Sequence, residues 1–174
     1  MDTKYLQSVK QQMLYYKSLA DKSIAQLSSE QLFERPNEES NSIAMIIQHM
    51  HGNMLSRWTD FLTSDGEKEW RQRDAEFEEV LRTKEEVLQK WEEGWSCLMN
   101  TLNELADTQL ADTVLIRNEP HTVTEAINRQ LAHYPYHVGQ IVFYVKALLG
   151  SGFKSLSIAK NQSQQFNEEK FGKS

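Results

Sequence analysis

Apolar residues recur every three or four positions over four long stretches of this 174-residue chain, and this periodicity limits the fold more than any other feature. Such spacing is typical of amphipathic helices, because it places the apolar side chains on one face. Seven glycines and three prolines leave few of the turn residues that a β-rich fold needs. The sequence therefore predicts an all-α protein whose helices cover residues 3–27, 43–62, 84–106 and 123–149.

Local signals mark where three of these helices begin and where the last one ends. The serines from Ser40 to Ser42 are candidate N-caps, and a Ser or Thr followed three residues later by Glu forms a capping box. Glycine can take the left-handed conformation that closes a helix. The two predicted capping boxes are Thr83 with Glu86 and Thr122 with Glu125, and the glycine is Gly150.

Four helices of about 20 residues or more predict an up-down four-helix bundle formed by residues 1–150. Residues 65–82 are polar, with isolated aromatic residues, and predict a long surface loop or a short helix packed on the bundle. Residues 151–174 are polar and poor in large apolar groups, so they predict a C-terminal tail packed on the bundle or trailing from it.

Charge and composition bear on the partners of the protein. The formal net charge of -6 and a pI near 5.4 argue against nucleic acid, because phosphate binding needs clustered Lys and Arg. No apolar run approaches the length of a membrane span, and the N-terminal residues lack the apolar core of a signal peptide. We therefore expect a cytoplasmic protein with no nucleic-acid or membrane partner.

The stretch LAHYPYHVGQI, residues 131–141, contains the residues with the clearest chemical potential. His133 and His137 are four apart, so both imidazoles could reach one metal ion from the same face of a helix. Gln140 and Tyr144 continue this polar stripe beside the apolar face. Pro135 stands between the histidines and cannot donate a backbone hydrogen bond, which predicts a local kink that re-aims the imidazoles.

A divalent metal site needs a third protein ligand, and residues 43–62 offer two candidates. Helical periodicity favours His51, but the inward face of a bundle helix is wide enough to keep His49 as well. His121 precedes the last helix and is expected at the surface. Neither His133 nor His137 has the Glu three residues earlier that di-iron bundles use, and HExxH, GxxxxGK[ST], GxGxxG and GxSxG motifs are absent.

The sequence resembles the DinB-like superfamily of bacterial metal-binding bundles. The stretches SIAMIIQHMHGNMLSRW and HYPYHVGQIVFYVK carry this resemblance, and YHVGQI is its most specific piece. SNSIAMIIQH, TDFLTSDGEKEWRQRDAEFEE and SLSIAKNQSQQFN are similar to a DinB-like subgroup of unknown function. The resemblance covers nearly the whole chain.

The resemblance implies a three-histidine site for zinc, nickel or a similar divalent ion, often within a homodimer. It matches His49 to the ligand of the second helix, seven residues after Ser42, and His133 with His137 to the pair on the fourth helix. His51 is the alternate. Some relatives resemble transferases or isomerases that use a low-molecular-weight thiol such as bacillithiol, mycothiol or glutathione.

Two hypotheses follow about function. In the first, the protein is a metal-dependent thiol S-transferase or hydrolase that activates a thiol or water, with Gln140 and Tyr144 as supporting or substrate-contacting residues. In the second, the bundle is a non-catalytic metal-binding or structural dimer. Exposed apolar residues such as Met45 and Phe143 are expected at the dimer surface. The sequence identifies no catalytic residue, and the expected partners are a second copy of the chain and a small-molecule ligand or thiol.

Overall fold

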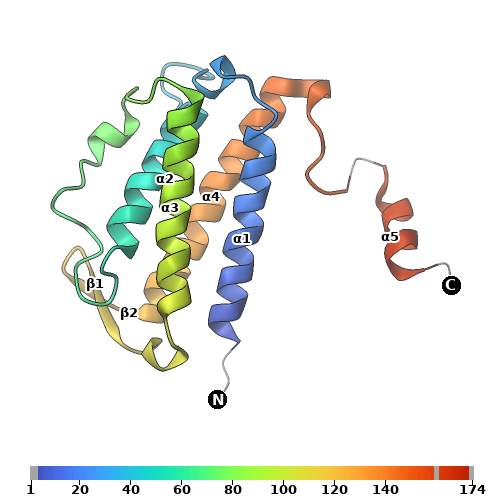
Figure 1. The fold of residues 1–174 in the computed structure, drawn as a ribbon. Helices are drawn as coiled ribbons and strands as arrows, with labels where there is room; N and C mark the ends of the chain where they lie inside the picture. The colour runs from blue at the N-terminus through green and yellow to red at the C-terminus, as the bar shows by residue number, and fades with distance from the viewer. Residues whose placement is uncertain (1–3, 159–160, 173–174) are drawn as a thin grey trace.

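The computed structural model describes residues 4–158 and 161–172, and it is mostly helical, as predicted. Four long helices lie side by side (Figure 1), with bounds close to the predicted ones. The start of the first predicted range, residue 3, lies outside the described residues. The helices are α1 (Tyr5–Ile24), α2 (Ile43–Trp58), α3 (Lys84–Glu104), α4 (Val123–Leu149) and the short α5 (Ser163–Phe171). The 3-10 helices are η1 (Glu30–Leu32), η2 (Asp74–Phe77), η3 (Asp107–Gln109) and η4 (Gly150–Gly152).

Side chains cap the helices as the sequence predicts. The Ser42 hydroxyl accepts a hydrogen bond from a backbone N–H in the first turn of α2. Thr83 and Glu86 form the predicted capping box at α3, and Thr122 and Glu125 form the one at α4. These contacts satisfy backbone donors that a helix start otherwise leaves without partners. The starts of α2, α3 and α4 are therefore fixed by local sequence.

Helices α2 and α3 run in the same direction. The His51 and Glu93 side chains meet at 3.0 Å, and Thr101 donates to the carbonyl of Trp58 at 2.9 Å, so later residues of one helix meet later residues of the other. Lys84, at the start of α3, donates to the carbonyl of Leu27 just beyond α1, so α1 and α3 are antiparallel. The strict up-down alternation predicted from the sequence therefore fails between α2 and α3.

The connection between α2 and α3, residues 59–83, explains this departure. A helix of 16 residues is about 24 Å long, so the chain must travel back along that length before it can start a parallel neighbour. The connection is a long loop containing the short helix η2, which confirms the sequence prediction. A side chain at Gly52 of α2 would collide with the carboxylate of Glu76, its Cβ lying 2.8 Å from the Glu76 Cδ. This glycine therefore allows η2 to approach α2 closely.

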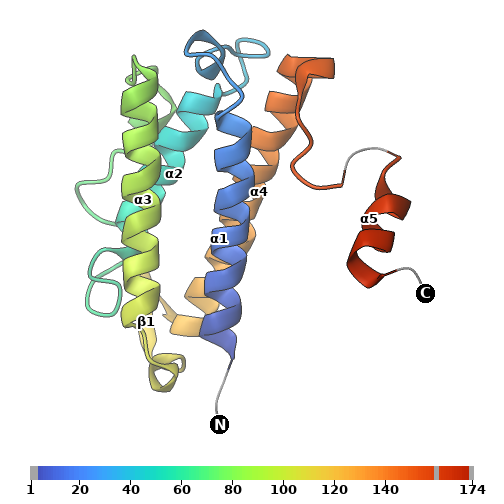
Figure 2. The same ribbon diagram turned by 45° about the vertical axis from the view of Figure 1, so that its right-hand side comes forward.

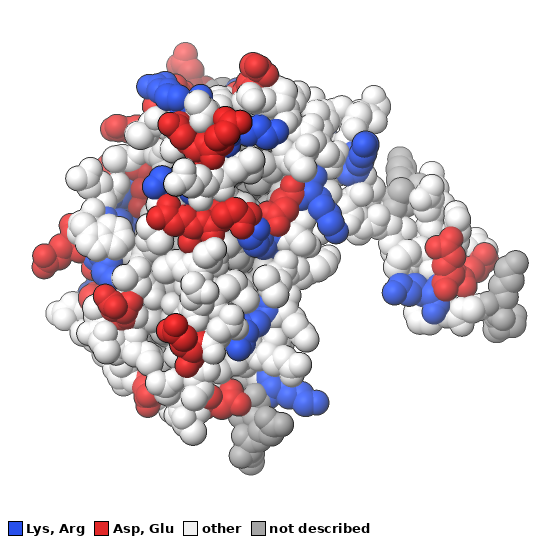
Figure 3. Space-filling view, in the orientation of Figure 1, with Lys and Arg blue, Asp and Glu red and all other residues white. Residues whose placement is uncertain are grey.

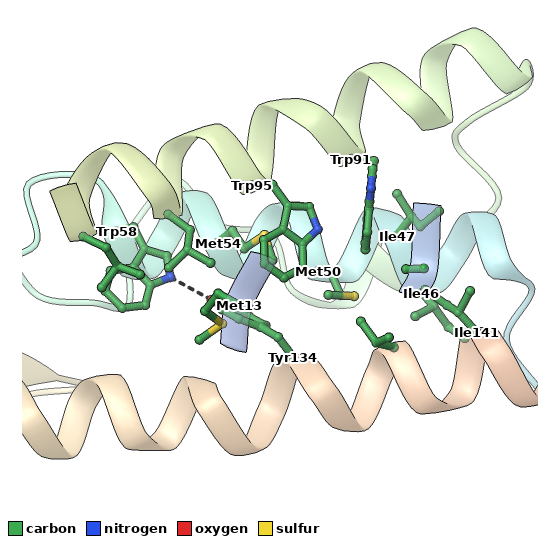
Figure 4. Close-up of a cluster of buried hydrophobic side chains, with 14 of the residues drawn as sticks. Met13, Ile46, Ile47, Met50, Met54, Trp58, Trp91, Trp95, Tyr134 and Ile141 are labelled. Atoms are coloured by element: carbon green, nitrogen blue, oxygen red, sulfur yellow. Dashed lines mark hydrogen bonds between the residues drawn. The ribbon is translucent and has the colours of Figure 1, made fainter. Parts of the chain in front are cut away.

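Large aromatic and sulfur-containing side chains fill the space between the four helices (Figure 4). Trp58 donates its Nε1–H to the Tyr134 hydroxyl at 2.9 Å, and that hydroxyl donates to Asn53 Oδ1 at 3.0 Å. Buried polar groups are costly unless they are paired, so this chain of bonds fixes α2 against α4. The other labelled core residues are Met13, Ile46, Ile47, Met50, Met54, Trp91, Trp95 and Ile141.

A β-hairpin that the sequence did not predict precedes α4. Strands β1 (Thr113–Ile116) and β2 (Glu119–Thr122) pair antiparallel around a two-residue turn. Arg117 and Asn118 form that turn with φ of 55° and 60°, the conformation that two-residue hairpins favour. Asp65 accepts both of their backbone N–H groups, at 2.8 and 2.6 Å. The hairpin is thus attached to the connection between α2 and α3.

Helix α4 continues through Pro135 from Val123 to Leu149. Any bend at this proline therefore leaves the helix unbroken. Gly150 ends α4, as predicted, and has a positive φ of 51°, but its ψ of -119° lies outside the left-handed helical conformation. The Gln26 side chain hydrogen-bonds the backbone of Lys154, whereas α5 lies apart from the other helices in two views (Figures 1 and 2).

Two expectations about the surface have different outcomes. Phe143 is 76 % exposed, as expected. Met45 is only 6 % exposed, because α2 packs against α3, α4 and η2 and is buried on almost every face. Placing Met45 at an outer surface was therefore wrong. The face drawn in Figure 3 carries acidic and basic side chains close together. Among the described residues, no helix has the length and apolarity needed to cross a membrane.

Candidate metal centre

Three histidines from two helices come together at one point. His49 lies on α2, and His133 and His137 lie one turn apart on α4. The Nε2 atom of His133 is 3.4 Å from that of His49 and 3.0 Å from that of His137. One ligand atom from each residue lies within 4.8 Å of the other two. The group could therefore hold a metal ion.

On α4, a glutamine side chain faces the second ring nitrogen of each histidine. Gln130 Oε1 lies 3.3 Å from His133 Nδ1, and Gln140 Oε1 lies 2.8 Å from His137 Nδ1. An amide oxygen can only accept a hydrogen bond, so each Nδ1 is assigned the proton. The Nε2 lone pairs of both rings are then free and point towards a shared position. Gln140, proposed from the sequence, supports His137 in this way.

On α2, His49 is held by a carboxylate. Its Nδ1 lies 2.9 Å from Glu76 Oε2, and its ring stacks on Phe77 with the centroids 4.8 Å apart. A carboxylate behind a ligating histidine fixes the ring orientation and makes the other nitrogen more basic. Because Glu76 and Phe77 belong to η2, the connection between α2 and α3 supplies this support.

Glu76 itself is bound by an arginine. Arg71 Nε lies 2.7 Å from Glu76 Oε1 and its Nη2 lies 2.9 Å from Oε2, a two-pronged ion pair. Burial alone would raise the pKa of Glu76, but the hydrogen bonds from His49 and Arg71 outweigh burial and hold that pKa below its ordinary value. Glu76 is therefore an anion and can accept the proton of His49 Nδ1.

The two histidines of α4 are neutral at physiological pH. Burial, followed by the nearby charges of His137 and His49, lowers the pKa of His133 to about 3. Burial also lowers the pKa of His137 to about 4, despite the opposing effect of Gln140. Neutral imidazole is the form that ligates metal ions. Protons therefore compete little with a metal at these two rings near pH 7.

The distances of His49 and His137 from His133 suit a small divalent ion. Two imidazole nitrogens at about 2.0–2.1 Å from one tetrahedral ion are about 3.3 Å apart. The observed separations of 3.4 and 3.0 Å bracket that value. Three histidine nitrogens leave one position of a tetrahedral ion for another ligand, the arrangement of catalytic rather than purely structural zinc sites.

The other candidates from the sequence lie elsewhere. His51 turns towards α3, where its Nε2 is 3.0 Å from Glu93 Oε2, and it is not part of the three-histidine group. Tyr144 is half-buried two turns beyond His137, and within the described ranges no hydrogen bond links its side chain to the histidines. His121 is half-buried on β2 rather than fully at the surface.

Sequence reasoning missed Glu76, Phe77 and Gln130. Glu76 and Phe77 lie in a polar segment that lacks the regular apolar spacing by which a buried face is recognised. Their contact with His49 arises only when that segment folds back on α2. Gln130 precedes His133 by three residues, the same spacing that separates His137 from Gln140. That repeated spacing of three on a helix could have identified Gln130.

Comparison with known proteins gives a family and a fold. No curated protein matches the chain significantly. A solved structure described as "Crystal structure of the conserved protein of locus from Enterococcus faecalis" is 15 % identical, with a TM-score of 0.63 over 86 % of this chain and 99 % of that one. It therefore shares the fold. The family described as "Protein of unknown function (DUF1572)" matches residues 1–162, so the chain belongs to that family.

Proposed function

We propose that this protein binds a divalent metal ion, zinc or nickel, through His49, His133 and His137, and that it is a metal-dependent thiol S-transferase or hydrolase. The observation that carries the proposal is the convergence of three Nε2 atoms, each on a ring whose Nδ1 faces an acceptor oxygen. Three lone pairs directed at one position repel one another unless a cation lies between them. The resemblance to DinB-like bundles supports the same ligand set.

When bound, the metal would supply a positive charge that favours the ionised form of a thiol or of water. The protein's own residues perform the positioning. Glu76 orients His49, while Gln130 and Gln140 orient the rings of α4. The Phe77 ring stacks on His49 and shields that ring from water, and Tyr134 packs beside His133. We place a low-molecular-weight thiol in the role of cosubstrate.

A non-catalytic metal-binding or structural role is the second candidate, and one observation favours it. The carboxylate nearest to the histidines, Glu76, is committed to His49 and Arg71, so it is not free to act as a general base. The Nε2 separations of 3.0 and 3.4 Å would also allow hydrogen bonds between the histidines, provided that one ring moves its proton from Nδ1 to Nε2. In that case the site would stabilise the bundle without turnover.

The wider proposal includes the assembly and location of the protein. Phe143 and Tyr136 expose aromatic rings on α4, which supports a homodimer. Residues 1–150 would form the functional bundle, of the DinB-like type, with residues 151–174 as a tail. A cytoplasmic location belongs to this proposal, because a reduced thiol cosubstrate requires a reducing compartment.

Elemental analysis of protein purified without a histidine tag tests metal binding. We expect about one equivalent of zinc or nickel, present at purification or restored by incubation with the ion. A metal content below about a tenth of an equivalent, which incubation with zinc or nickel does not raise, would contradict the proposal. Substitution of His137 by Ala separates the two candidates: an intact fold with lost thiol transfer supports the enzyme. Loss of fold and metal together, with an inactive parent, supports the structural role.

A further inference from the structure

A pocket of about 230 Å³ adjoins the three-histidine group, and five arginines line it. His49 and His133 form part of its wall, so a molecule in the pocket would lie next to the candidate metal position. The arginines come from four segments that are distant in sequence: Arg57 of α2, Arg71 and Arg73 of the connection, Arg117 of the hairpin turn and Arg129 of α4.

The arginines around this pocket outnumber the carboxylates that pair with them. Glu67 lies 3.1 Å from Arg57, 3.4 Å from Arg71 and 3.2 Å from Arg117, so one carboxylate is shared among three arginines. Glu76 forms a second pair with Arg71. Like charges this close repel one another strongly, and an additional anion would relieve that repulsion.

Two of the arginines are not engaged in ion pairs among the described residues. Arg73 and Arg129 are exposed at the pocket, and within residues 4–158 and 161–172 neither forms an ion pair. They come from two different segments, Arg73 from the connection and Arg129 from α4. Their guanidinium groups can therefore close on a ligand without first breaking a contact within the protein.

Arg57, which lines the pocket, carries a buried hydrogen-bond donor that lacks an acceptor among the described residues. It is 5 % exposed, and its side chain donates to the carbonyl of Gly66 and to Glu67. Its Nε–H group is buried and, in the part of the chain that the structure describes, has no acceptor. A buried donor without an acceptor is costly, and native sites usually pair such a group.

We propose that this arginine pocket binds an anionic oxygen group, a carboxylate or a phosphate, of the small molecule on which the protein acts. Guanidinium groups match both anions, because their planar forks donate two parallel hydrogen bonds. The statement about a substrate rests on the proposed function, since His49 and His133 at the pocket wall would direct the rest of the molecule to the metal. The pocket is smaller than a typical drug-sized site of about 300–1,000 Å³, which suits one charged group.

Calorimetric titration of the metal-free protein with inorganic phosphate and, separately, with succinate tests the pocket without reference to turnover. We expect at least one of them to bind, more weakly as salt concentration rises. The Arg73→Gln/Arg129→Gln double variant should bind about tenfold more weakly or worse, because it loses two charge-assisted contacts. The Arg82→Gln variant is the matched control, since Arg82 is an exposed arginine outside the pocket.

Zinc loading then tests whether the pocket and the metal share a ligand. The loaded protein should bind 3-mercaptopropionate at least about tenfold more tightly than propionate, because only the thiol can add a bond to the metal. Equal affinities would overturn the assignment of the anion to a substrate of the metal site.

The outcomes separate this inference from the proposed function. Anion binding that the double variant weakens, in a protein that takes up no metal, would support the pocket and contradict the metal proposal. Normal zinc uptake with no binding of phosphate or succinate up to about 10 mM would overturn the pocket and leave the metal centre standing. Equal anion binding by wild-type protein and the double variant, with a folded variant by circular dichroism, would also overturn it.

Discussion

The Oε2 atom of Glu76 lies 2.9 Å from Nδ1 of His49, and this contact joins the connection between α2 and α3 to the three-histidine group. Glu76 is 27 residues away from His49 along the chain, in a segment with little apolar character. Through Arg71 the same carboxylate is linked to Glu67 and so to the arginine pocket. One buried carboxylate therefore connects the candidate metal ligand with the candidate anion site.

Substitution of Glu76 by Gln should weaken metal binding about tenfold or more, the usual effect of losing a carboxylate behind a ligating histidine. It should also lower stability by a few kcal/mol, because buried Arg71 would lose its two-pronged partner and keep only the longer contact with Glu67. Zinc titration against a competing chelator and urea unfolding measure the two effects. Glu78→Gln is the control, since Glu78 is exposed two residues away. Equal zinc affinity in both variants would show that Glu76 does not support the site.

Substitution of Gly52 by Ala should displace Glu76, because the added Cβ would collide with its carboxylate. We expect weaker zinc binding and a lower melting temperature. Gly139→Ala is a matched control on α4, because the added Cβ meets no atom within 4 Å beyond its chain neighbours and the helix's own backbone. Helix propensity should then stabilise the protein by up to about 1 kcal/mol. A Gly52 variant that binds zinc as the control does would contradict the close approach of η2 to α2.

Substitution of single histidines by Ala should separate the three-histidine group from His51. The His49, His133 and His137 variants should each retain well under one equivalent of zinc, because two imidazoles hold the ion far less firmly than three. The His51 variant should retain a full equivalent, since His51 faces Glu93 on α3. Elemental analysis after dialysis measures the stoichiometry, and zinc loss from the His51 variant alone would reverse the assignment.

Stability of the metal-free protein should fall as the pH is lowered from 7 to 5. The pKa values of His133 and His137 are about 3 and about 4 in the folded protein, below the ordinary value near 6.5 that applies on unfolding. The unfolded chain therefore binds more protons in this range, and acid favours it. The stability that the folded protein gains from keeping these two histidines neutral is fully present above about pH 6.5 and decreases towards pH 4.

Urea unfolding in the presence of a chelator, at several pH values from 5 to 7, checks this prediction. The His133→Gln/His137→Gln variant should show a smaller change in unfolding free energy over the same range, because neither amide titrates. A pH dependence identical to that of the wild-type protein would mean that other groups control it.

The sequence alone determined the helices and most of the site on α4. Apolar spacing and capping boxes are local properties, so the bounds of α4 and the starts of α2 and α3 followed from short-range chemistry. The pairing of His133 with His137 also followed, because residues four apart on a helix must be neighbours. The choice of His49 over His51 needed the family resemblance, since helical periodicity favoured the other residue.

Only the tertiary structure decided what surrounds these residues. The parallel course of α2 and α3, the return of η2 onto Gly52, and the hairpin turn at Arg117 depend on how distant segments pack. No local pattern marks Glu76 as a partner of His49, or Arg57 and Arg129 as walls of one pocket. Their chemistry arises from charges brought together across the fold, where burial makes each electrostatic contact stronger than it would be in water.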